Sequence, residues 1–219
     1  MIRSLFVLAL LLAAPLAAQI PVGGTKVAAG VAGLQLRVDQ STSAADPDDV
    51  PDVQVAATAD GYDIKTGPAA VIWDPANTAT GNYVLRGTFR LNERSNHTNY
   101  YGLILGGRDL QGPNQNYIYF LVAQNGTFLI KHRMGDMVHD IVDNTANPAV
   151  IAMAAGDPPS TNLLLVRVNP TDVDFVVNGF VVHTVPRTSL AGATDGIWGV
   201  RVNHVLPRVS VAGLAVTQH

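Results

Sequence analysis

Short apolar runs, each ended by turn-forming residues, recur through most of this sequence. The runs are rich in Val, Ile, Phe and Tyr, and Gly, Pro, Asn and Asp lie between them, which is typical of strands joined by tight turns. No window carries a 3.6-residue apolar repeat long enough to favour a helix. We therefore predict an all-β, two-sheet antiparallel β-sandwich, with strands near residues 53–58, 69–73, 83–91, 101–105, 117–123, 128–132, 162–168, 173–177, 180–185, 197–202 and 209–216.

Residues 1–18 have the zones of a secretory signal peptide in their usual order. Arg3 precedes an apolar run over residues 5–14, and small residues lead to Ala18. The run is shorter than the roughly 20 residues that a membrane span needs. We predict cleavage after Ala18 and export to the periplasm or the extracellular space. No later apolar run approaches that length, so we expect no membrane span in the mature chain.

Charge and cysteine content limit the classes of partner. Charged residues make up 14% of the chain and the formal net charge is −3, and cleavage removes one more positive charge with Arg3. A nucleic-acid-binding surface needs the opposite balance, so we predict no nucleic-acid partner. The chain has no cysteine, so its stability after export depends on the core and not on disulfides.

The mature chain divides into a lead-in and one large domain. Residues 19–52 are predicted to hold a leader strand and an acidic loop, and residues 53–219 the single sandwich domain. The loop contains Asp46, Asp48, Asp49 and Asp52, which could bind calcium but lack the glycine-pinned spacing of an EF-hand. The histidines show no zinc-binding spacing. We therefore predict no metal site and no cofactor, with a solvated loop favoured over a calcium site.

Two Asn-Gly pairs predict β-hairpins, because both residues of this dipeptide accept positive φ. Two-residue loops at Asn125-Gly126 and Asn178-Gly179 fix the expected registers. In the second hairpin, Val177 is predicted to face Phe180, and Phe175 to face Val182. In the first hairpin, one side is predicted to carry Tyr117, Tyr119, Leu121, Ala123, Phe128, Ile130 and His132. Both sides of this first ribbon are largely apolar, so we expect it to be central in its sheet.

Catalytic patterns are weak in this sequence. Asp172 and Asp174 form the only pair of carboxylates two residues apart on a predicted strand, and an exposed edge is the simpler interpretation of that pair. No Gly-x-Ser-x-Gly turn marks a nucleophile. We assign no catalytic residue.

Binding residues are better represented. Flat aromatic faces together with planar hydrogen-bonding groups suit saccharide recognition, although core packing accounts for many tyrosines. The residues we select for a ligand site on the concave sheet are Tyr117, Tyr119, His132, Trp198, Arg201 and His204.

The last third of the chain resembles the concanavalin A-like, laminin-G-like jelly-roll superfamily. The resemblance is carried by Asn-Leu-Leu-Leu-Val-Arg at 162–167, Val-Val-Asn-Gly at 176–179, the segment Gly-Ile-Trp-Gly-Val-Arg-Val-Asn-His at 196–204, and Val-Ser-Val at 209–211. Residues 83–91 and 101–104 are similar to an earlier strand pair of that superfamily. The resemblance covers residues 53–216 and implies a jelly-roll sandwich.

Within that superfamily, Gly199-Val200-Arg201 with His204 is most similar to the 3-keto-disaccharide hydrolases. The chain departs from them at Tyr100 and Tyr101, which replace an Asn-Ser pair, and residues 105–107 supply no carboxylate. The Glu-x-Asp-x-x-Glu strand of laminarinase-like glycosidases is absent. The resemblance therefore transfers the fold and not the activity.

Three functions are consistent with these observations. The first is a secreted, non-catalytic module that binds a glycan or another extracellular partner on its concave face. The second is a glycoside-processing hydrolase of the 3-keto-disaccharide type, which needs a carboxylate near His204. The third is a purely structural module, favoured if both faces of the first hairpin are fully buried and no groove remains.

Overall fold

The structure, a computed structural model, describes residues 27–29, 31–39, 53–203 and 205–219. The predicted signal peptide, the acidic loop around Asp46, Asp48, Asp49 and Asp52, and His204 lie outside the described residues. Among the described residues, no helix is long and apolar enough to cross a membrane.

The described residues form β-strands and one short 3-10 helix, η1 (Leu190–Gly192). The strands are β1 (Val27–Ala29), β2 (Gln35–Asp39), β3 (Val53–Ala57), β4 (Gly61–Thr66), β5 (Ala69–Ala79), β6 (Tyr83–Glu93), β7 (Tyr100–Arg108), β8 (Asn116–Ala123), β9 (Thr127–Met134), β10 (Met137–Ala146), β11 (Ser160–Val168), β12 (Asp172–Val177), β13 (Phe180–Pro186), β14 (Gly196–Val202) and β15 (Leu206–Gln218). Every predicted strand is present, so the all-β prediction is confirmed.

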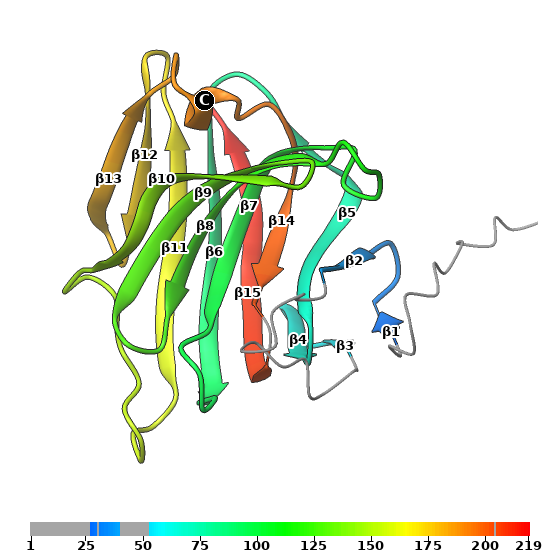
Figure 1. Cartoon of the computed structure of the whole chain (residues 1–219), viewed down its shortest axis with the longest axis vertical. Helices are drawn as coiled ribbons and strands as arrows, with labels where there is room; N and C mark the ends of the chain where they lie inside the picture. The colour runs from blue at the N-terminus through cyan, green and yellow to red at the C-terminus, as the bar shows by residue number, and fades with distance from the viewer. Residues whose placement is uncertain (1–26, 30, 40–52, 204) are drawn as a thin grey trace, which may run out of the picture.

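In the described part of the chain, these strands make two facing sheets (Figure 1). The eight-stranded sheet has the order β1-β3-β4-β15-β6-β11-β12-β13, and the seven-stranded sheet has the order β10-β9-β8-β7-β14-β5-β2. Neighbouring strands are antiparallel except β1 and β3, which pair in parallel. The predicted two-sheet sandwich is therefore confirmed, with one parallel pair at an edge.

Two strands within the sandwich were not expected from the sequence. β4 is short and alternates apolar residues with polar ones, and β10 forms an edge of the seven-stranded sheet with mostly exposed residues. An exposed edge strand buries little and needs no regular apolar repeat. From the predicted lead-in, β1 pairs with β3 and β2 pairs with β5.

The main core lies between the two sheets. Its buried aromatic side chains come from both sheets and include Tyr83, Phe89, Tyr101, Phe120 and Phe175. Side chains alternate between the faces of a strand, so each strand that contributes to this core also presents residues to its outer face.

A second buried cluster covers the outer face of the seven-stranded sheet. Its members come from that sheet and from the loop after β7: Val71, Trp73, Tyr100, Ile104, Leu110, Tyr117, Tyr119, Leu121, Ala123 and Leu129. The β8–β9 ribbon is internal in this sheet, as predicted, and carries buried side chains on both faces.

The predicted register of the first hairpin is wrong by one residue. Tyr119 faces Lys131 and Phe120 faces Ile130, whereas a two-residue loop would place Tyr119 opposite His132. Gly126 alone has a positive φ, of 83°, and its N–H donates to the Ala123 carbonyl at 3.1 Å. A single left-handed glycine is typical of a longer hairpin loop with a bulge.

The second hairpin begins in the predicted register and then departs from it. Asn178 and Gly179 both have positive φ, of 50° and 87°, and Val177 faces Phe180 as expected. A β-bulge then shifts the pairing, so that Phe175 faces His183 in place of Val182. Phe175 is buried, but Phe180 is 68% exposed, so the tip of this hairpin lies outside the core, whereas Val182 packs against the core and Val185 is part of it.

Candidate functional site

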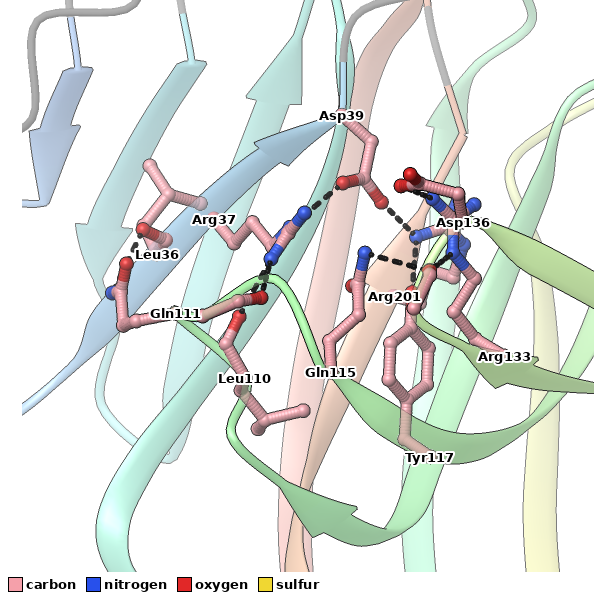
Figure 2. Close-up of polar contacts among 12 residues, drawn as sticks. Leu36, Arg37, Asp39, Leu110, Gln111, Gln115, Tyr117, Arg133, Asp136 and Arg201 are labelled. Carbon is pink, nitrogen blue, oxygen red and sulfur yellow. Dashed lines mark hydrogen bonds and ion pairs between the residues drawn. The ribbon is translucent and has the colours of Figure 1, made fainter.

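Three of the residues selected from the sequence meet on the outer face of the seven-stranded sheet. Tyr117 and Tyr119 project from β8, and Arg201 projects from β14. Figure 2 shows Tyr117 beside Arg201. The Tyr117 hydroxyl lies 2.8 Å from Arg201 Nη1, and the Arg201 guanidinium carbon lies 5.1 Å from the centroid of the Tyr119 ring. The two tyrosine rings are tilted, with centroids 5.7 Å apart. One cation is thus fixed over one ring and against the hydroxyl of another.

A carboxylate from β2 also contacts this cation. Asp39 Oδ2 accepts from Arg201 Nη1 at 2.7 Å, and Asp39 Oδ1 accepts from Arg37 Nε at 3.0 Å. Arg37 Nη1 donates in turn to the carbonyl oxygen of Gly112 at 2.8 Å. Figure 2 shows Asp39 between the two arginines, with Arg37 reaching the loop after β7. This loop and β2 are thereby joined at one end of the face.

The protonation state of Asp39 follows from these contacts. Burial alone would raise its pKa, but the charge and hydrogen bond of Arg201, together with those of Arg37, hold the pKa below its usual value. The pKa of Arg201 is raised despite its burial, because Tyr117, Asp39 and Tyr119 all favour the charged form. Both members of the pair therefore stay ionised over the working range of pH.

The tyrosines are held in their neutral form. Burial raises the pKa of Tyr117 and of Tyr119, and the nearby Arg201 offsets this only in part. The Tyr117 hydroxyl therefore remains a hydrogen-bond donor that also accepts from Arg201. The Arg201 Nε atom is buried and has no hydrogen-bond partner among the described residues.

Two further cations from β9 border this arrangement at its more open end. Lys131 Nζ lies 2.8 Å from an oxygen of Asp140, and Arg133 Nε donates to the carbonyl oxygen of Gly135 at 2.6 Å. Their side chains are 21% and 20% exposed, against 10% for Arg201. We call the set Arg37, Asp39, Tyr117, Tyr119, Lys131, Arg133 and Arg201 the Arg201 face. Of Lys131, Arg133 and Arg201, the two cations from β9 are the more exposed.

The other selected residues are not part of this face. His132 lies on the opposite side of β9, where Nε2 is 3.1 Å from the Asn116 side-chain oxygen and the ring stacks on His139. Burial, and to a lesser extent the charge of His139, lower its pKa. Trp198 belongs to the core between the sheets. The structure does not describe His204.

Four members of the Arg201 face were missed in the sequence. The wrong register of the first hairpin removed Lys131 and Arg133 from the expected side and placed His132 there. Arg37 and Asp39 lie in a segment treated as lead-in. Gln-Leu-Arg-Val-Asp at residues 35–39 alternates polar and apolar residues, and this period of two is the pattern that could have identified β2.

The chemistry available on this face is hydrogen bonding. Guanidinium and ammonium groups donate and Asp39 accepts. Tyr117 and Tyr119 are buried, at 1% and 7% exposed, and position Arg201. Asp39 is a poor proton donor because two arginines stabilise its ionised form. Within the described ranges, no group of three or more His, Asp or Glu residues could hold a metal ion.

No protein-family model matches the chain, and no curated protein is similar to it in sequence. Solved structures nevertheless share its architecture. The carbohydrate-binding module CBM66 from Bacillus subtilis has a TM-score of 0.59 at 9% identity, covering 89% of this chain and 99% of that chain. A Bacillus subtilis protein of unknown function with a galectin-like fold has a TM-score of 0.59 at 14% identity, covering 84% of this chain and 89% of that chain. The chain therefore has the concanavalin A-like jelly-roll sandwich fold that its sequence resembles.

Proposed function

We propose that this protein is a non-catalytic glycan-binding module whose ligand contacts the Arg201 face. The observation that carries the proposal is the fixed cation: Arg201 lies 5.1 Å from the Tyr119 ring centroid and is held by Asp39 and Tyr117. A guanidinium that is already oriented loses little freedom when it donates to a ligand. Sugar hydroxyls both donate and accept, so they suit a surface that presents cationic donors and a carboxylate together.

The architecture is compatible with this function. One structure with the same fold is a carbohydrate-binding module, but a sandwich of this kind hosts many functions. The residues that support glycan binding are therefore this chain's own. Lys131 and Arg133 add half-buried donors beside the paired tyrosines.

Export is part of the proposal, because residues 1–18 have the composition of a signal peptide. The glycan would then be met in the periplasm or outside the cell. The solvated acidic loop, favoured over a calcium site, stays a prediction, and so does the finer resemblance to the 3-keto-disaccharide hydrolases, which concerns His204.

A glycan array with the purified protein, followed by calorimetry on the strongest hit, tests the proposal. Arg201→Lys keeps the positive charge but loses the planar fork, and we expect it to weaken binding by about tenfold. Tyr119→Ala removes the ring under Arg201 and should weaken binding at least as much. Arg90→Lys makes the same substitution on β6, where Arg90 is exposed, and should leave the affinity unchanged.

The purely structural alternative makes the opposite prediction. Near its turn, the first hairpin is buried on both faces, with Leu121 and Phe120 both 0% exposed. Burial of this kind is what a structural module needs. If no glycan binds, or if Arg201→Lys and Arg90→Lys have equal effects while both variants remain folded by circular dichroism, the proposed function is wrong.

A further inference from the structure

Strands β5 and β14 separate from regular pairing near one end of the seven-stranded sheet. Gly199 pairs with Trp73 and Ile197 pairs with Thr78, so Trp198 alone lies opposite residues 74–77. The bulged segment contains Pro75, which has no N–H to give to a neighbouring strand. It is stabilised locally, because Asp74 Oδ1 accepts from the backbone N–H of Ala76 at 2.9 Å. Bulges re-aim side chains and are common beside functional sites.

A hollow of about 140 Å³ lies at this bulge, against the turn that joins β3 to β4. Three aromatic side chains line it, together with two carboxylates and one amide: Tyr62, Trp73, Trp198, Asp60, Asp74 and Asn77. Neither carboxylate forms an ion pair with a lysine or arginine in the described part of the chain. None of the residues of the Arg201 face lines this hollow.

One donor in the wall has no partner. Trp198 is 8% exposed, and its indole N–H makes no hydrogen bond among the described residues. A buried donor without a partner costs free energy, so an acceptor supplied by a ligand would stabilise the site. A ligand that brings a hydrogen-bond acceptor to this wall is therefore favoured over one that does not.

We infer that the hollow is a second binding site, which takes a single sugar ring. A cavity of roughly 150 Å³ holds one benzene molecule, and a hexose has about twice as many heavy atoms. A hollow of about 140 Å³ can therefore receive one face of a single sugar ring and not an oligosaccharide. Sugar hydroxyls can donate to Asp60 and Asp74 and accept from Trp198 and Asn77. The ring is either a free monosaccharide or one residue of a glycan.

A quaternary ammonium ligand fits the hollow less well. Aromatic walls with nearby carboxylates attract such cations. However, a quaternary ammonium group has no acceptor, so it would leave the Trp198 N–H unpaired. The unpartnered donor thus favours a hydroxylated ring over a cation.

The inference can be tested by nuclear magnetic resonance, since the chain has two tryptophans and both line the hollow. We expect one or more of glucose, galactose, mannose, fructose and N-acetylglucosamine to shift the indole N–H signal of Trp198 to lower field in a saturable manner. The signal is assigned by its loss in Trp198→Phe. A disaccharide of the same sugar distinguishes a free monosaccharide from a residue of a glycan.

Matched carboxylate variants give the control. Asp74→Asn keeps an oxygen for the Ala76 N–H but loses the charge, and we expect the Kd for the sugar to rise by about tenfold. Asp157→Asn makes the same change at an exposed aspartate that also accepts from a backbone N–H, that of Ala154 at 2.7 Å, and should leave the Kd unchanged.

Three results would overturn the inference. The first is that no sugar shifts the Trp198 signal. The second is that tetramethylammonium shifts and saturates it while sugars do not, which would make the hollow a cation site. The third is that Arg201→Lys abolishes the sugar-induced shift in a folded protein, because the hollow would then not be independent of the Arg201 face. A failure of the Arg201 face to bind glycans leaves the inference intact.

Discussion

The outer faces of the two sheets each carry an arginine–aspartate pair of the same length but of different burial. On the seven-stranded sheet, Arg201 and Asp39 are 2.7 Å apart and their side chains are 10% and 14% exposed. On the eight-stranded sheet, Arg208 and Asp63 are also 2.7 Å apart, with side chains 53% and 23% exposed. Contact distance therefore does not separate the two pairs. Burial does, because it decides how much each charge depends on its partner.

Removing Arg201 should have the largest effect on stability. Arg201→Leu leaves Asp39 buried with only Arg37, and it leaves the Tyr117 hydroxyl without its partner. We expect the free energy of unfolding to fall by about 3 kcal/mol, at the lower end for one partner of a buried ion pair, because Arg37 remains. Urea unfolding followed by circular dichroism measures the change.

Arg86→Leu is the control for that variant. Arg86 lies exposed on β6, so the same substitution there should change the free energy of unfolding by less than about 0.5 kcal/mol. If the two variants lose equal stability, the Arg201–Asp39 pair does not behave as a buried pair.

The second-largest effect is expected in the pH dependence of stability, through Asp39. The folded protein holds the pKa of Asp39 below 3.8, so protonation favours the unfolded state. The contribution of Asp39 is complete above that value and is lost as the pH falls through the folded-state pKa. The stability difference between wild type and Asp39→Asn should therefore be largest near about pH 6 and shrink toward about pH 2. A difference that grows on acidification would contradict the pairing.

The sequence predicted the sandwich well because its strands are apolar, regularly spaced and bounded by turn residues. It predicted the faces of those strands less well, and the two Asn-Gly hairpins show why. Both dipeptides permit a two-residue loop and also a longer loop with one left-handed glycine. Asn178-Gly179 adopts the first, and Asn125-Gly126 adopts the second. The dipeptide identifies a turn but does not select between these loops.

A one-residue slip has consequences for the whole candidate site, because it moves every side chain of one strand to the other face. Beside Tyr119 the structure has Lys131, where the sequence predicted His132. Trp198 illustrates the second difficulty. The surroundings of Trp198 depend on a bulge in the neighbouring strand β5, and the spacing of residues within β14 does not predict that bulge. Asp39 shows a third, because its partner Arg201 is 162 positions away in the sequence, and such contacts leave no local pattern.

The smallest effect on stability is expected for the exposed Arg208–Asp63 pair on the eight-stranded sheet. Arg208→Ala should lower the free energy of unfolding by less than about 1 kcal/mol, since water and ions already screen this pair. In this variant Asp63 also keeps its hydrogen bond from Ser210, which, more than the charge of Arg208, holds the pKa of Asp63 below the usual value.

Repeating the urea titration at about 1 M NaCl should remove most of the stability loss caused by Arg208→Ala, since the Debye length there is about 3 Å. The loss caused by Arg201→Leu should persist at that ionic strength, because its partner is shielded from solvent. If salt removed both losses equally, both pairs would be energetically exposed, and burial would not be what separates the two faces.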